Sequence, residues 1–152
     1  MLKFDAASAR LKLKELLQAD LREALAYLNS TTSHRFTALY RFDGETLHNV
    51  YFYDRENPEI TQAEDIPIEA SYCVFVRNQK STWTTENSEA DPRANGHPKQ
   101  YVVRSYCGVP LVGIDGKVFG SVCHFDFEKL PFSPEAVTMM ELVADLIPNS
   151  PK

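Results

Sequence analysis

The N-terminal segment carries leucines at the spacing of an amphipathic helix. They recur every three or four residues, and charged side chains fill much of the opposite surface. These leucines are Leu13, Leu17, Leu21, Leu25 and Leu28. No glycine or proline interrupts the segment, and serine and threonine at 30–33 follow it. The pattern predicts one continuous helix over residues 6 to about 29.

Two later segments alternate apolar and polar residues around an Asp-Gly pair. Residues 35–42 and 46–53 flank Asp43-Gly44, and residues 105–126 are centred on Asp115-Gly116. Asp-Gly in this setting is a strong hairpin signal, because a type I′ turn needs positive φ at both central residues. We therefore predict two antiparallel hairpins with these pairs at their tips.

The alternation also predicts which side chains share a face of the sheet. Counting outward from the second turn pairs Gly113 with Val118, Val109 with Val122, Gly108 with Cys123 and Cys107 with His124. Directly opposed residues share a face, so Cys107 and Cys123 should point to opposite faces and form no disulfide. In the first hairpin, Phe36, Ala38, Tyr40 and Phe42 share one face, and we expect this aromatic face to belong to the core.

The remaining segments connect and flank the hairpins. We predict a surface connection at 55–67, a short helix at 68–79, a strand at 81–85 and a polar loop at 86–100. A loop of this length in a compact domain is functional or disordered. The last helix is expected to begin at Ser133-Pro134, with serine as the N-cap, and to stop at Pro148.

These elements predict an α+β fold with a central antiparallel sheet. The terminal helices should cover one face, and the short helix and long loop should cover a pocket on the other. The 152 residues suffice for one domain, 1–152, with the helix at 1–32 and the sheet, pocket loop and last helix at 33–152.

Composition narrows the classes of function. The net charge of −5, with no basic run, argues against nucleic-acid binding. No apolar stretch approaches the roughly 20 residues of a membrane span, and the N-terminus lacks the pattern of a signal peptide. We therefore expect a cytoplasmic protein. Three cysteines without CxxC spacing indicate buried free thiols and neither a disulfide framework nor a zinc site.

A series of short motifs resembles the GAF domain family, small-molecule-sensing modules of signalling proteins. In order, they are Ser71-Tyr72-Cys73, Asp91-Pro92-Arg93, Tyr106-Cys107-Gly108-Val109-Pro110-Leu111, Gly120-Ser121-Val122-Cys123 and Phe132-Ser133-Pro134-Glu135. No single motif is specific, and the resemblance rests on their order and spacing over about half of the chain. It implies a GAF/PAS-like fold and a pocket for a small molecule, whose identity the sequence leaves unknown.

The same resemblance separates three branches of the family. Cyclic-nucleotide binders carry Asn-Lys-x-Asp before the last helix, where this chain has Phe-Glu-Lys-Leu-Pro at 127–131. Bilin binders have Cys-His opening a helix, whereas Cys123-His124 falls in a predicted strand. Free methionine-(R)-sulfoxide reductases attack with a loop cysteine that the loop 91–104 lacks, which leaves Cys73 and Cys107 as the plausible thiols.

Eight residues form the candidate ligand site. Tyr72, Cys73, Trp83, Tyr101 and Tyr106 should surround the covered face, joined by Asp91, His97 and Cys123. No spacing among Asp91, His97 and Asp126 fits a metal site. We predict no catalytic residues.

Three functions stay open at the level of the sequence. The first is a sensory domain whose ligand orders the loop at 86–104 and biases the terminal helices, with a separate signalling protein as the output. The second is a ligand-free interaction module that forms a homodimer through its leucine-rich N-terminal helix. The third is the reductase.

Overall fold

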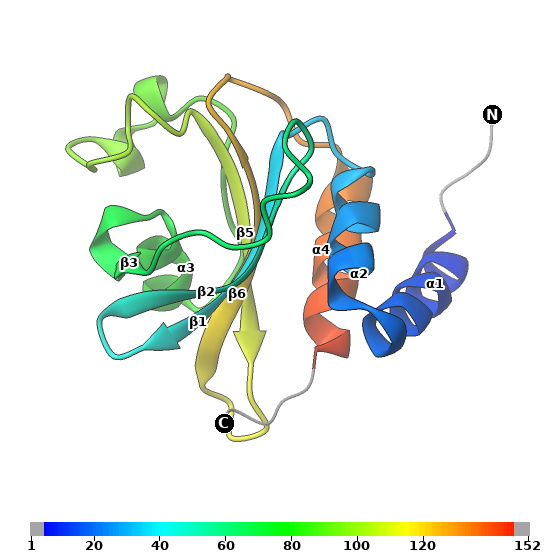
Figure 1. Cartoon of the computed structure of the whole chain (residues 1–152). Helices are drawn as coiled ribbons and strands as arrows, with labels where there is room; N and C mark the ends of the chain where they lie inside the picture. The colour runs from blue at the N-terminus through cyan, green and yellow to red at the C-terminus, as the bar shows by residue number, and fades with distance from the viewer. Residues whose placement is uncertain (1–4, 148–152) are drawn as a thin grey trace.

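The computed structural model describes residues 5–147 and folds them around one sheet (Figure 1). The α-helices are α1 (Ala6–Ala19), α2 (Leu21–Asn29), α3 (Cys73–Gln79) and α4 (Pro134–Leu146). The strands are β1 (Phe36–Asp43), β2 (Thr46–Asp54), β3 (Ile66–Pro67), β4 (Trp83–Thr85), β5 (Ser105–Val112) and β6 (Val118–Asp126). Three 3₁₀ helices, η1 (Ile68–Ala70), η2 (Ser88–Ala90) and η3 (Pro92–Ala94), lie in the connections.

The six strands form one antiparallel sheet in the order β3-β2-β1-β6-β5-β4. Helices α2 and α4 pack on one face, and α1 packs on these two helices (Figure 1). Helix α3 and the loops cover the other face. The predicted α+β architecture, with terminal helices on one side only, is therefore confirmed.

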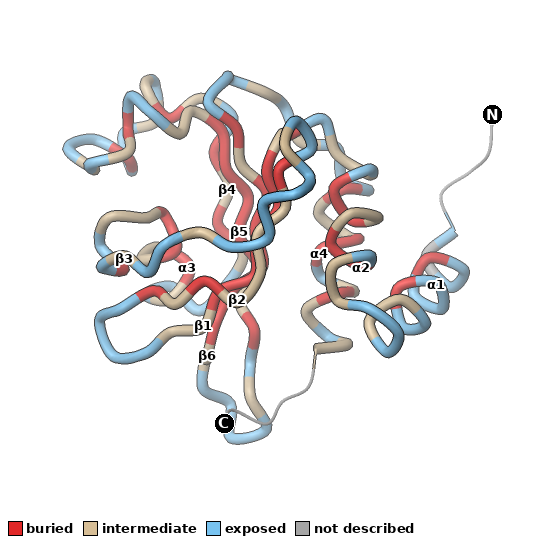
Figure 2. The backbone as a smooth tube through the Cα atoms, in the orientation of Figure 1, coloured by how far each residue is buried: buried red, intermediate tan, exposed pale blue. Residues whose placement is uncertain are grey.

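The alternation of side chains along the strands produces two cores, with the buried strands between them (Figure 2). The helix-side core contains Leu39, Val109 and Val122 of the sheet, packed against leucines and methionines of the helices. The cavity-side core contains Ala38, Tyr40 and Cys123 of the sheet, packed against α3 and Trp83. Cys107 lies in the first core and Cys123 in the second, as the alternation predicted.

The predicted N-terminal helix is wrong in one respect, because it is two helices. Asp20 has an extended backbone (φ −163°, ψ 112°) and separates α1 from α2. Its side chain accepts a hydrogen bond of 2.9 Å from the backbone N–H of Arg22 and so caps α2. Aspartate competes in this way for backbone donors and favours N-caps over helix interiors.

Both hairpins exist, but their turns differ from the prediction. Only one residue in each turn has positive φ, Gly44 at 62° and Gly116 at 80°. In the first hairpin Asp43 pairs with Thr46, so the central residues are Gly44 and Glu45. A glycine with positive φ at the first central position is the pattern of a type II′ turn.

The second hairpin keeps the predicted register except near its tip. Cys107 faces His124, Gly108 faces Cys123 and Val109 faces Val122, as counted from the sequence. A bulge between Leu111 and Val112 then pairs Val118 with Val112 in place of Gly113. The three residues between Gly113 and Lys117 form the loop, with the backbone N–H of Gly113 donating to the Lys117 carbonyl at 2.8 Å.

The segments covering the second face are more structured than predicted. The expected helix at 68–79 begins only at Cys73 and is preceded by η1. The loop at 86–100 contains η2 and η3 and closes around the buried side chain of Gln100. The Gln100 amide donates to the Ser88 carbonyl (3.3 Å) and to Asn95 Oδ1 (2.9 Å), while Ser88 Oγ donates to the Gln100 carbonyl (2.6 Å).

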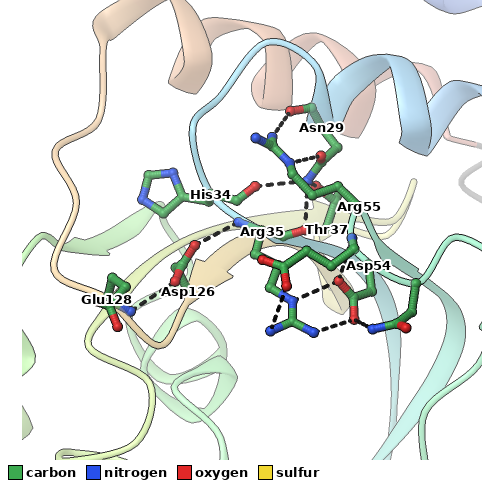
Figure 3. A network of polar contacts seen from close by, with 10 residues as sticks. Asn29, His34, Arg35, Thr37, Asp54, Arg55, Asp126 and Glu128 are labelled. Carbon is green, nitrogen blue, oxygen red and sulfur yellow. Dashed lines mark hydrogen bonds and ion pairs between the residues drawn. The ribbon is translucent and has the colours of Figure 1, made fainter.

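A polar network fixes the end of the sheet where α2 leads into β1 (Figure 3). Arg35 forms two hydrogen bonds with the buried carboxylate of Asp54, at 2.8 and 2.9 Å. Arg55 binds the side chain and the carbonyl of Asn29 at 2.8 and 2.7 Å. Asp126 accepts from the backbone N–H of Arg35 at 2.9 Å. The network thus joins α2, β1, β2 and β6.

Helix α4 begins as predicted, with Ser133 Oγ accepting from the Ala136 N–H at 3.1 Å and Pro134 at the first helical position. Pro148, the predicted stop, lies outside the described residues.

Candidate functional site

A cavity of about 200 Å³ lies between the sheet and its cover on the face opposite the terminal helices. Its floor consists of strand residues that alternation turns to this face: Tyr40, Phe52, Tyr106, Cys123 and Phe125. Its cover consists of Ala63, Ile66, Ala70, Ser71, Tyr72, Lys99, Val102, Val103 and Phe127. The wall is therefore mainly aromatic and aliphatic, which is the usual character of a small-molecule site.

One hydrogen bond joins two parts of this cover. The Tyr72 hydroxyl, just before α3, donates to the carbonyl of Val103 at 2.9 Å. The Tyr72 ring also contacts the ring of Tyr106 on the floor, with centroids 5.5 Å apart. Tyr72 thus fixes the cover over the sheet.

The absence of a side chain at Gly108 makes room for Tyr106. A Cβ at this position would lie 2.7 Å from Cε1 and 2.8 Å from Cζ of the Tyr106 ring. These distances are too short for carbon atoms that are not bonded to each other, so only glycine leaves room for the ring in this position.

Two cysteines lie at or under the floor. Cys73 Sγ contacts the Tyr106 hydroxyl at 3.1 Å and Ser121 Oγ at 3.3 Å, whereas Cys123 lines the cavity itself. Burial raises the pKa of the Cys123 thiol. Burial also opposes ionisation of Cys73, but hydrogen bonds from Cys123, Ser121, Ser71 and Tyr106 outweigh it and lower the pKa of that thiol.

The structure brings three of the eight predicted site residues into the cavity wall, namely Tyr72, Tyr106 and Cys123. Cys73 and Trp83 are buried behind this wall. The Trp83 ring lies 5.4 Å from that of Tyr72 and 6.0 Å from that of Tyr106, centroid to centroid. These two residues support the wall without lining it.

The other three predicted residues lie outside the cavity. Asp91 binds Arg93, whose hydrogen bonds lower the pKa of the carboxylate to about 2. His97 packs on the outer side of Tyr72 at 4.6 Å, where burial lowers its pKa. Tyr101 is 68% exposed, so its expected place on the covered face is wrong.

Sequence reasoning missed most of the floor and the one charged group. Tyr40 belongs to the aromatic face of β1 that we assigned to the core, and Phe52 lies in the paired aromatic strand. Phe125 lies in the second hairpin and was not singled out. Lys99 lies in a loop whose course no periodicity predicts. It is the only charged residue in the described wall.

The reductase alternative depends on Cys73 and Cys107 acting together, and the sheet separates them. Cys73 lies in the cavity-side core and Cys107 in the helix-side core. Burial raises the pKa of Cys107 to about 12, so its thiol stays protonated. All three cysteines are buried and free.

Two further features concern residues 5–147. No group of three or more histidine, cysteine, aspartate or glutamate residues there has the arrangement of a metal site. None of the helices described is long and apolar enough to cross a membrane.

Comparison with known proteins identifies one family. The family described as GAF domain matches residues 13–149 of the chain. No curated protein matches the sequence. The GAF domain of an Acinetobacter phosphoenolpyruvate-protein phosphotransferase has a TM-score of 0.70 at 15% identity, over 96% of this chain and 94% of that chain.

Two reductases are also among the similar structures. Type II free methionine-R-sulfoxide reductase from Thermoplasma acidophilum has a TM-score of 0.66 at 20% identity, over 88% of this chain and 91% of that chain. The free methionine-R-sulfoxide reductase from Neisseria meningitidis, in complex with its substrate, has a TM-score of 0.69 at 17% identity, over 96% and 89%. Similarity at these identities shows a shared fold.

Proposed function

The chain belongs to the GAF domain family, and from this premise we propose that it is a sensory domain that binds a small molecule in the cavity over its sheet. The observation that carries the proposal is the cavity itself, about 200 Å³ in volume and walled by rings and aliphatic side chains. An apolar cavity of about 150 Å³ is large enough to hold benzene. The site is therefore of the size for a ligand of one or two rings.

The sheet offers a route from this cavity to the terminal helices. Tyr40 lines the cavity, while the preceding residue, Leu39, packs in the helix-side core. A ligand that shifts β1 therefore shifts both faces together. We propose that binding biases α2 and α4 and that a separate signalling protein reads this change, in the cytoplasm.

Dimerisation through the N-terminal helix is a separate proposal, and it depends on an exposed residue of that helix rather than on the periodic leucines. Leu13, Leu25 and Leu28 are fully buried in the chain's own core, so they are not available to a partner. Leu11 of α1 is 60% exposed and is the residue on which a helix-mediated homodimer would depend. If the Leu11→Glu variant has the same oligomeric mass in solution as the wild type, the proposal of a dimer through Leu11 is wrong.

Native mass spectrometry tests the sensory proposal directly. Protein purified gently from its host should carry an excess mass that disappears on denaturation. Ala70→Leu fills the cavity from the end of η1 and should remove that mass. Ala90→Leu is the matched control, because Ala90 ends η2 in the same way but is exposed outside the cavity. Equal excess mass in both variants would place the ligand elsewhere.

A further inference from the structure

The residues of the cavity wall indicate the chemical class of the ligand as well as its size. Resting on the proposed function, we propose that it takes an apolar carboxylate of one or two rings, whose anionic group pairs with Lys99. Three features of the wall support this ligand: its distribution of charge, the unpaired state of Lys99 and the hydrogen bonds already made by the other polar groups.

Among residues 5–147, the wall has a positive charge and no negative one. Lys99 is the single charged residue that this part of the chain contributes, and none of its aspartates or glutamates lines the cavity. A cationic ligand would meet Lys99 without any carboxylate to offset the repulsion. An anionic ligand would gain a partner in a partly desolvated site, where charge-assisted hydrogen bonds are stronger than in water.

The ammonium group of Lys99 is available, although its backbone is held. The Lys99 N–H donates to His97 Nδ1 at 3.0 Å, and its carbonyl accepts from Val102 and Val103 at 2.9 Å each. The side chain is half-buried and forms no ion pair with any of the residues described. The loop therefore presents a cation whose charge the protein itself leaves unpaired.

Three hydroxyl groups of the wall already have partners. The hydroxyls of Tyr72 and Tyr106 are bonded to the Val103 carbonyl and to Cys73. Ser71 Oγ accepts from the Cys73 N–H at 3.1 Å, and its hydroxyl also bonds the Cys73 thiol. Lys99 therefore supplies the available charged donor on the cover. A ligand with an apolar body toward the floor and acceptor oxygens toward the cover satisfies this donor.

Three probes of nearly the same shape test this inference: phenylacetate, phenylacetamide and 2-phenylethylamine. Trp83, the only tryptophan, contacts two wall residues and reports binding by its fluorescence. We expect phenylacetate to bind about tenfold more tightly than the amide, the usual gain for a hydrogen bond to a charged group, and the amine to bind most weakly. Lys99→Gln should remove the preference, and Lys99→Arg should retain it.

The control variant is Lys117→Gln, at the exposed tip of the β5–β6 hairpin, which should leave all three affinities unchanged. High salt should reduce the preference of the wild-type protein for phenylacetate over phenylacetamide. Equal binding of phenylacetate and phenylacetamide, or a preference that persists in Lys99→Gln, would overturn the inference while leaving the cavity as a ligand site. If Ala70→Leu fails to weaken binding of the amide, or no probe binds, the proposed function itself falls, and the inference with it.

Discussion

The hydroxyl of Tyr72 donates a hydrogen bond of 2.9 Å to the carbonyl of Val103 in the wall of the cavity. The two residues lie 31 positions apart, one beside α3 and the other in the segment that enters β5. Both also line the cavity. Their bond therefore connects the stability of the cover to the shape of the site.

Replacing this tyrosine with phenylalanine should separate the two contributions of the side chain. Tyr72→Phe retains the ring and leaves the Val103 carbonyl without its partner, so we expect a loss of about 1 kcal/mol in the free energy of unfolding. Affinity for phenylacetamide should fall as well. Urea unfolding and Trp83 fluorescence measure the two effects. Tyr101→Phe, at a 68% exposed ring, is the control. Equal effects of both variants would contradict this role.

A side chain at Gly108 should destabilise the fold. An alanine in a strand is ordinarily more stable than glycine. Here its Cβ would lie 2.7 Å from Cε1 of Tyr106, a residue that is 2% exposed and so has little room to move aside. We therefore expect Gly108→Ala to destabilise the fold by about 1–3 kcal/mol, measured by urea unfolding. In a Tyr106→Leu background the penalty should shrink, since the ring is gone. Additive effects would show that the ring is not the cause.

The sequence predicted the fold well because each core has a local signature. Alternation along β1 and β6 determined which side chains face the helices, and the two glycine-containing turns made the strands antiparallel neighbours. The details of the turns were wrong, because Asp-Gly also occurs in loops with a single residue at positive φ. The break at Asp20 was missed because helical periodicity continues through it.

The site was harder to predict, because it depends on contacts between distant segments. Tyr72 was identified from its neighbourhood in a motif, and the structure places it in the wall. Tyr101 is a residue of the same type in the loop, yet it faces solvent. Nothing in the periodicity distinguishes these two tyrosines. Their positions follow from the fold of a loop held by Ser88 and Gln100.

The break between α1 and α2 provides a prediction of its own. Asp20→Ala removes the side-chain acceptor for the Arg22 N–H, so we expect a loss of about 1 kcal/mol in the free energy of unfolding. Asp20→Asn keeps an acceptor and should lose much less. Urea unfolding followed by circular dichroism measures both. A rise in helicity without loss of stability in Asp20→Ala would show that the two helices fuse and that the cap is dispensable.

Two buried histidines on the helix side of the sheet make stability depend on pH. His34 and His124 are fully buried, and each Nδ1 is hydrogen-bonded at 2.7 Å, to Thr32 and Thr37 respectively. Burial lowers the pKa of His34 to about 4 and that of His124 to about 3. Both rings are therefore neutral in the folded protein across the range where an unfolded histidine takes up a proton.

The direction of the effect follows from these pKa values. Below about pH 6.5 the unfolded chain binds protons that the folded chain excludes, so stability falls as the pH drops towards 4. At pH 5 the loss should be about 2 kcal/mol for each histidine relative to pH 7.5, measured by urea unfolding at the two pH values. His124→Gln should remove about 2 kcal/mol of this dependence on pH, even if it lowers stability throughout, while His34 and His97 keep their own contributions. His48→Gln, at a ring that is 32% exposed, should leave the contribution of the buried pair intact. A wild-type protein equally stable at both pH values would show that these rings accept protons within the fold.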